Sequence, residues 1–165
     1  MKKSLHFICP TDGLETIIDG AFRQENYYYS SLGNSVLFNR KMLRDLKKLI
    51  LEKNITEISF VLCNNNRIVS DAFSNQGFSG IRGLNNFYDK VMEQKERVEI
   101  LWKTLNTESL ILSYYLNQKI KELEKGLSRL AIKGLKFSGK IYDKKEDSFK
   151  DIYPNLICMD YPNFN

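Results

Sequence analysis

Residues 57–63, EISFVLC, constrain the fold more than any other stretch of this chain. Apolar residues occupy both of the alternating faces of this segment, whereas a half-exposed strand alternates apolar and polar residues. A strand that is buried on both faces is typical of the middle of a parallel sheet, which helices cover on either side. The run then ends abruptly in three asparagines, residues 64–66, which places amide groups at the end of a buried strand.

The segments around this strand predict an alternation of strands and helices. Strands are expected over residues 5–9, 26–30, 57–63, 135–143 and 156–160. Helices are expected over residues 14–22 and 39–54, and then from Asn86 and from Thr107 onwards, while residues 64–86 should be loop with at most one turn of helix. Asn39 can cap the second of these helices, since a stripe of apolar residues at 3- and 4-residue spacing follows it. We therefore predict an α/β fold with an open, mostly parallel sheet of four to five strands and flanking helices, as a single domain spanning residues 1–165.

Composition narrows the class of protein. A hydrophobic share of 42% and a charged share of 27% are ordinary for a soluble globular protein. No apolar run approaches the roughly 18–20 residues that cross a bilayer. The 3 cysteines, an odd number without close spacing, fit a reducing compartment, so a cytoplasmic location is expected. The net charge of +5 permits contact with nucleic acid or acidic partners without requiring it, since acids and bases interleave over residues 119–129.

Three separated segments, in the same order, resemble the β-class carbonic anhydrases. The first runs from a strand ending at Cys9 to LGNSV, residues 32–36. In that family a strand ending in Cys-x-Asp-x-Arg precedes a strand that runs into Arg-Asn-Ala-Gly-Asn. The second, RDLKKLILEKNITEISFVL, is similar to the family's helix and strand that lead to Gly-His-x-x-Cys-Gly. The third, LKFSGKIYDKKEDSFKDI, is similar to the closing strand with its Gly-x-x-Tyr-Asp motif and hairpin.

The resemblance implies a zinc site at the carboxyl ends of neighbouring strands. In the family, two thiolates and an imidazole hold zinc, the fourth position carries water or the aspartate, and an arginine orients that aspartate. Zinc lowers the pKa of bound water towards 7, so that hydroxide attacks carbon dioxide.

This sequence keeps only part of the family's first motif, Cys-x-Asp-x-Arg, when the two are aligned residue by residue. Cys9 matches the family's first cysteine. The aspartate position falls on Thr11 and the arginine position on Gly13, although Asp12 is adjacent and can reach in if the loop shifts by one residue. Asp12 is therefore the candidate for the family's aspartate.

The second motif departs further from the family. Aligning the strand ends places Cys63 at the family's histidine, Asn66 at its second cysteine and Arg67 at the following glycine. The resemblance thus assigns the zinc-ligand positions to Cys9, Cys63 and Asn66, and only Cys9 keeps the family's residue type.

Two functions lead at this stage, and a third, a nucleic-acid-binding module, rests on the net charge and the tyrosines alone. The first is a non-catalytic relative, without metal, that is retained for binding or assembly. We favour it because the histidine, the second cysteine and the Asp-Arg pair are all changed in one chain. The alternative is a zinc-dependent carbonate dehydratase with a rearranged site, in which Cys9 and Cys63 bind zinc together with Asp12, and Asn66 is a poor fourth ligand. No cofactor is expected under the first hypothesis, and zinc under the second.

Partners follow from the same reasoning. A homodimer is expected, because family members generally pair and the second strand is aromatic. A small anion or bicarbonate can be bound by small-residue loops such as SSLGNS and FSGIRG. Nucleic acid is not expected from the tyrosines at 27–29, since strand alternation sends them to both faces of the sheet. His6, the only histidine, lies on the face opposite to Cys9 by the same alternation, so a nucleophilic Cys-His pair is not predicted.

Overall fold

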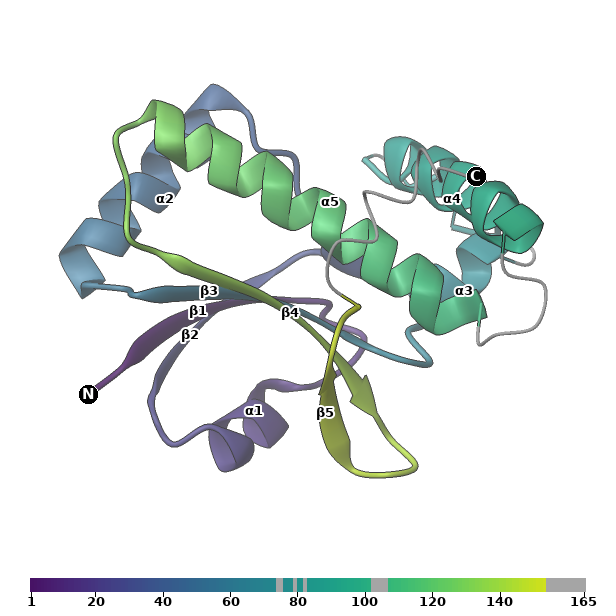
Figure 1. Cartoon of the computed structure of the whole chain (residues 1–165), viewed down its shortest axis with the longest axis horizontal. Coiled ribbons are helices and arrows are strands. Elements are labelled where there is room, and N and C mark those ends of the chain that lie inside the picture. The colour runs from purple at the N-terminus through teal and green to yellow at the C-terminus, as the bar shows by residue number, and fades with distance from the viewer. Residues whose placement is uncertain (74–75, 79, 82, 102–106, 154–165) are drawn as a thin grey trace, which may run out of the picture.

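A five-stranded sheet forms the centre of the molecule, with strands in the order β2-β1-β3-β4-β5 (Figure 1). The computed structural model describes residues 1–73, 76–78, 80–81, 83–101 and 107–153. The strands are β1 (Lys3–Ile8), β2 (Glu25–Ser30), β3 (Glu57–Cys63), β4 (Lys136–Asp143) and β5 (Ser148–Asp151). Strands β1 to β4 pair in parallel, and β5 is antiparallel to β4. This is the mostly parallel sheet that the sequence predicts.

Helices cover both faces of this sheet. They are α1 (Glu15–Ala21), α2 (Arg40–Lys53), α3 (Arg67–Phe73), α4 (Asn85–Leu101) and α5 (Thr107–Arg129), with a short 3-10 turn at Leu32–Asn34. Figure 1 shows α2 and α5 on one side of the sheet and α1 on the other. A strand that is apolar on both faces, as β3 is, therefore has a helical layer on each side.

Two hydrophobic clusters lie on opposite faces of the sheet. The larger one takes Leu5 and Phe7 of β1 and packs beneath α2 and α5. The smaller one takes Ile8 and joins it to Leu14 and Ile18, at and within α1. Alternate residues of a strand thus enter opposite clusters, so the position of a residue in its strand decides which layer it faces.

Helix α2 begins and ends where the sequence predicts. The Asn39 side chain accepts a hydrogen bond from the Met42 N–H (2.9 Å), which satisfies a donor of the first turn. Asn54 ends the helix in the left-handed conformation, at φ 57°, a conformation that asparagine tolerates better than most residues. Leu46 and Ile50 are buried on the inner side of the helix.

The structure differs from the sequence prediction in the segment after β3. Helix α3 occupies the 7 residues Arg67–Phe73, in a stretch where the sequence predicts loop with at most one turn of helix. The predicted strand at residues 156–160 lies outside the described residues, and the fifth strand of the sheet is instead β5. None of the helices in the described part of the chain has the length and apolar character needed to cross a membrane.

Candidate functional site

The ends of β1 and β3 are where an open α/β sheet offers a crevice. The chain leaves β1 for β2 through α1 on one face, and returns from β2 to β3 through α2 on the other face. Strand β1 lies between β2 and β3, so the strand order reverses there. Ligands of such sheets bind at the carboxyl ends of the strands at this switch point, and both Cys9 and Cys63 lie at those ends.

Asp12 ties these two strand ends together. Its Oδ2 accepts a hydrogen bond from the Cys63 backbone N–H (2.9 Å), and its Oδ1 accepts one from the Asn66 amide nitrogen (2.8 Å). Its own N–H donates to the Cys9 carbonyl (3.0 Å). Burial raises the pKa of the Asp12 carboxyl, and the two accepted hydrogen bonds oppose that rise. The side chain of Asp12 thus reaches the predicted site region, and each of its two oxygens accepts one hydrogen bond from the protein.

Asn66 acts as the cap of the next helix. Its Oδ1 accepts a hydrogen bond from the Val69 N–H (3.0 Å), while its amide nitrogen donates to Asp12. Asn66 is 1% exposed. Both polar groups of the side chain are therefore satisfied inside the protein, as an asparagine at a helix N-cap requires.

The thiol of Cys9 lies on the α2 and α5 side of the sheet. Its sulfur accepts a hydrogen bond from the Gly33 N–H (3.1 Å) and lies 3.1 Å from the Thr11 hydroxyl oxygen. Cys9 belongs to the larger hydrophobic cluster. Thr11, at the family's aspartate position, is thus next to the thiol, and the left-handed Gly13 (φ 62°) supplies no side chain at the arginine position.

Cys63 belongs to the opposite cluster, on the α1 side. The register explains this separation. Phe7 is paired with Phe60, so two residues further along each strand Cys9 falls beside Leu62. Cys63 is one residue further again, and a one-residue step in a strand turns a side chain to the other face. The structure therefore does not bring the two thiols together.

The Cys63 thiol is also a weak source of thiolate. Burial raises its pKa, and the nearby Asp12 carboxylate raises it further. The thiol lies 2.8 Å from the Asn65 side-chain oxygen, to which it can donate. Because the thiolate is both the metal ligand and the nucleophile, this environment favours neither role.

Two polar residues of the loop after β2 belong to this region, although the sequence analysis named their loop and neither residue by itself. Asn34, fully buried, donates from its amide to the Val61 carbonyl (3.1 Å), and its Oδ1 has no partner among the described residues. The Ser31 hydroxyl is likewise without a partner there. Asn34 adopts φ 56°. The signal was present in LGNSV, where a Gly-Asn pair predicts left-handed backbone.

His6 is buried away from this site. Its Nε2 donates to the Asn26 side-chain oxygen (2.8 Å), and its Nδ1 lies 3.2 Å from the Ser59 hydroxyl. Its ring stacks on Tyr28 and Phe22, on the α1 side of the sheet. Burial lowers the pKa of His6. The prediction that His6 and Cys9 occupy opposite faces is confirmed.

The residues at the strand ends do not fit a zinc ion. Asp12 and Asn66 direct their polar atoms at each other and at backbone groups. The thiols of Cys9 and Cys63 face different layers. Within the described residues, no three His, Cys, Asp or Glu side chains are grouped as a metal would need. Cys158 lies outside the described residues.

An open groove of about 470 Å³ lies beside this region. Tyr29 at the end of β2, Ser31, Ser35 and Met42 line one part of it, and Leu84 lines another. The SSLGNS segment, predicted as an anion-binding loop, thus borders a groove of mixed apolar and hydroxyl character.

Comparisons with known proteins found similarity at the level of solved structures. No protein-family model matches this sequence, and no curated protein matches it. Among solved structures, one of the tetrameric β-carbonic anhydrases from the filamentous ascomycete Sordaria macrospora is 14% identical, with a TM-score of 0.72, over 92% of this chain and 80% of that chain. The β-carbonic anhydrase CafD of Aspergillus fumigatus is 16% identical, with a TM-score of 0.72, over 93% of this chain and 90% of that one.

A β-carbonic anhydrase from Coccomyxa, solved in complex with acetazolamide, is 12% identical, with a TM-score of 0.68, over 92% of this chain and 72% of that chain. Identities this low establish the fold alone. The chain therefore has the fold of the β-carbonic anhydrases.

Proposed function

We propose that this chain is a non-catalytic protein built on the β-carbonic anhydrase fold and retained for binding or assembly. The observation that carries the proposal is the hydrogen bonding of Asp12. Both of its carboxylate oxygens accept hydrogen bonds, from the Cys63 N–H and from the Asn66 amide. The carboxylate therefore stabilises the two strand ends, and a metal or its bound water would compete with these protein donors for it.

The rearranged zinc enzyme is the competing proposal. It needs the thiols of Cys9 and Cys63 to approach one metal ion, although they pack in different layers. It also draws Asp12 towards a metal, and any buried donor that loses its acceptor in that movement costs about 1–3 kcal/mol. Both rearrangements would have to occur together, so the non-catalytic role is the better supported of the two.

Zinc content separates these proposals. The protein is purified without a metal-affinity tag and without chelator, and zinc per chain is measured by plasma mass spectrometry. Carbon dioxide hydration is then measured before and after incubation with zinc. We expect substoichiometric zinc and no hydration above that of Cys9→Ser.

The control is Cys158→Ser, which removes the remaining cysteine. About one zinc per chain that Cys9→Ser or Cys63→Ser abolishes and Cys158→Ser leaves in place would establish the rearranged metal site. Zinc that is lost only from Cys158→Ser would mean that Cys158, and neither Cys9 nor Cys63, holds the metal.

The assembly proposed is a homodimer formed through β2. This strand is an edge of the sheet, and every residue in it is partly or fully exposed. The proposed location is cytoplasmic, which is supported by free thiols at both Cys9 and Cys63. The groove at the end of β2 lies beside this edge and is bordered by the SSLGNS loop. Because that loop is the candidate for anion binding, small anions such as bicarbonate are the first ligands to test there.

A further inference from the structure

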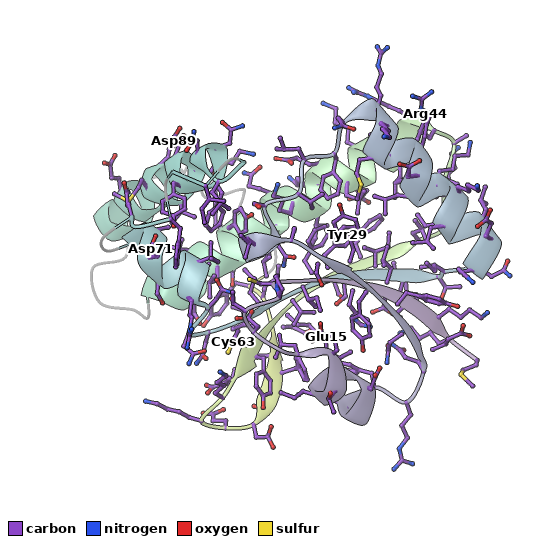
Figure 2. All side chains as sticks on the ribbon, turned by 180° about the vertical axis from the view of Figure 1, so that it is seen from behind. Glu15, Tyr29, Arg44, Cys63, Asp71 and Asp89 are labelled. Atoms are coloured by element: carbon purple, nitrogen blue, oxygen red, sulfur yellow. The ribbon has the colours of Figure 1, made fainter. Side chains whose placement is uncertain are left out.

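Helix α2 carries a dense row of positive charge on its outer side. Arg40, Arg44, Lys47 and Lys48 recur at intervals of 3 or 4 residues, so they share one face of the helix. That face is opposite to Leu46, which is buried in the core. Figure 2 shows Arg44 on the side of α2 that is turned away from the sheet.

Helix α5 extends the row sideways. The two helices touch at Gly126, where an added Cβ would lie 2.8 Å from the Leu43 side chain. One turn further along both helices, the Lys47 ammonium donates to the Leu130 carbonyl (3.0 Å). The two helices therefore cross, with their backbones closest near Gly126, as Figure 1 shows. We call the joint surface the basic face; it consists of Arg40, Arg44, Lys47, Lys48, Lys125 and Arg129.

Little of this charge is neutralised within the chain. Among the described residues, no acidic side chain lies within ion-pair distance of Arg44, Lys125 or Arg129. Lys48 is 3.8 Å from Glu52, in an exposed pair of the kind that contributes little. Like charges one helical turn apart destabilise a helix, so an external anion would relieve repulsion as well as add attraction.

We propose that the basic face binds the phosphate backbone of double-stranded nucleic acid without reading its sequence. Successive turns of a helix place cations about 5.4 Å apart, and packed helices lie about 8–10 Å apart. A row of cations over successive turns of α2, extended where α5 crosses it, matches a polymer with regularly spaced phosphates better than an isolated anion. Arginine binds phosphate in bidentate fashion, which suits Arg40, Arg44 and Arg129.

The composition of the face limits what it can recognise. The sequence of α2 contains no aromatic residue. Aromatic side chains are what stack on unpaired bases, and Trp or Phe typically anchors membrane-binding helices. A face with cations and without aromatic side chains favours contact with the backbone of a duplex, where phosphate contacts give affinity but no sequence information. The inference goes beyond the proposed loss of catalysis and holds whether or not zinc is bound.

The test uses fluorescence anisotropy with a labelled 24-base-pair duplex of mixed sequence, as DNA and as RNA, over a range of sodium chloride concentrations. We expect binding in the micromolar range at low salt, with a slope of log affinity against log salt of roughly −4. The double variant Arg44→Glu/Arg129→Glu should weaken binding by at least tenfold and make the slope shallower by about 2.

A matched control changes the net charge equally at exposed positions on the other side of the sheet, as Arg23→Glu/Lys145→Glu. We expect this control to bind nearly as wild type does. Equal weakening in both double variants, or no binding by wild type at low salt, would overturn the proposal. So would binding of the basic face to vesicles of phosphatidylglycerol and phosphatidylcholine in the absence of any binding to the duplexes. Circular dichroism melts confirm that each variant is folded.

Discussion

The Asp12 carboxylate has a structural role at the strand ends, where ligands of open α/β sheets usually bind. It is 9% exposed, and both of its oxygens accept hydrogen bonds from residues at or after the end of β3. Burial raises its pKa, and the two hydrogen bonds offset only part of this cost of holding the charged form. The residue therefore contributes to stability by satisfying two buried donors.

Asp12→Ala is expected to lower the free energy of unfolding by about 2–4 kcal/mol, because the Cys63 N–H and the Asn66 amide lose their acceptor. Asp12→Asn should cost less, since its oxygen can still accept from the Cys63 N–H. Urea unfolding at neutral pH measures both. A loss below about 0.5 kcal/mol in Asp12→Ala would show that the carboxylate does not hold the strand ends.

At the scale of the secondary-structure element, helix α5 holds the loop after β2 in place through two hydrogen bonds. The Tyr115 hydroxyl donates to the Asn34 carbonyl (2.8 Å), and the Lys119 ammonium donates to the Val36 carbonyl (2.8 Å). Lys119 is 3% exposed and lies 3.8 Å from Glu122. Burial lowers the pKa of Lys119 to about 8, and the Glu122 carboxylate opposes this shift only in part.

The buried lysine predicts a dependence of stability on pH. Lys119 takes up a proton near pH 8 in the folded state and near 10.5 when unfolded. Between those values the unfolded state binds more protons, so the free energy of unfolding rises with pH. Below pH 8 the charged Lys119 is buried in every folded molecule, and this lowers the free energy of unfolding by about 3 kcal/mol.

Lys119→Met removes this titration, so wild type should gain stability relative to Lys119→Met as the pH rises from 7.5 to 10. Urea unfolding of both proteins at several pH values gives the difference. Lys121→Met, at an exposed position of the same helix, is the control and should follow wild type. Identical pH profiles for wild type and Lys119→Met would contradict the assignment.

At the scale of the whole molecule, the two edge strands of the sheet differ in the side chains that they carry. The edge strand β5 carries Lys150 and Asp151, and charged side chains of this kind discourage pairing between sheets. The edge strand β2 carries three tyrosines in sequence. Its hydrogen bonds to β1 include Glu25 N–H to the Lys2 carbonyl and Ser31 N–H to the Ile8 carbonyl. Strand alternation then turns the N–H groups of even-numbered residues, Ser30 among them, to the open edge.

Ser30→Pro is therefore expected to convert the proposed dimer to a monomer without loss of the β1–β2 ladder, because proline removes an N–H that faces the partner. Sedimentation equilibrium on wild type and variant measures the change in mass. Ser30→Ala, which keeps the N–H, should remain dimeric. A wild-type monomer at all concentrations would refute the assembly, and a dimeric Ser30→Pro would place the interface elsewhere.

Local sequence patterns were sufficient to predict the class of fold and the order of most of its elements. Residues 57–63 are apolar on both faces, and such a strand is stable only between two layers of helices. Asn39, with the apolar stripe that follows it, predicted the start and the inner face of α2. These are local properties, since cap preference and periodicity depend on neighbours within one turn or one pleat.

The arrangement of the candidate site, by contrast, follows from tertiary packing. Cys9 and Cys63 both lie at strand ends, yet they face opposite layers, because the pairing register between β1 and β3 offsets them by one residue. Asp12 meets Asn66 only through the loop that joins β1 to α1. The basic face likewise requires α2 and α5 to approach at Gly126. Register and helix contact depend on the packing of segments far apart in the chain, which local sequence patterns do not encode.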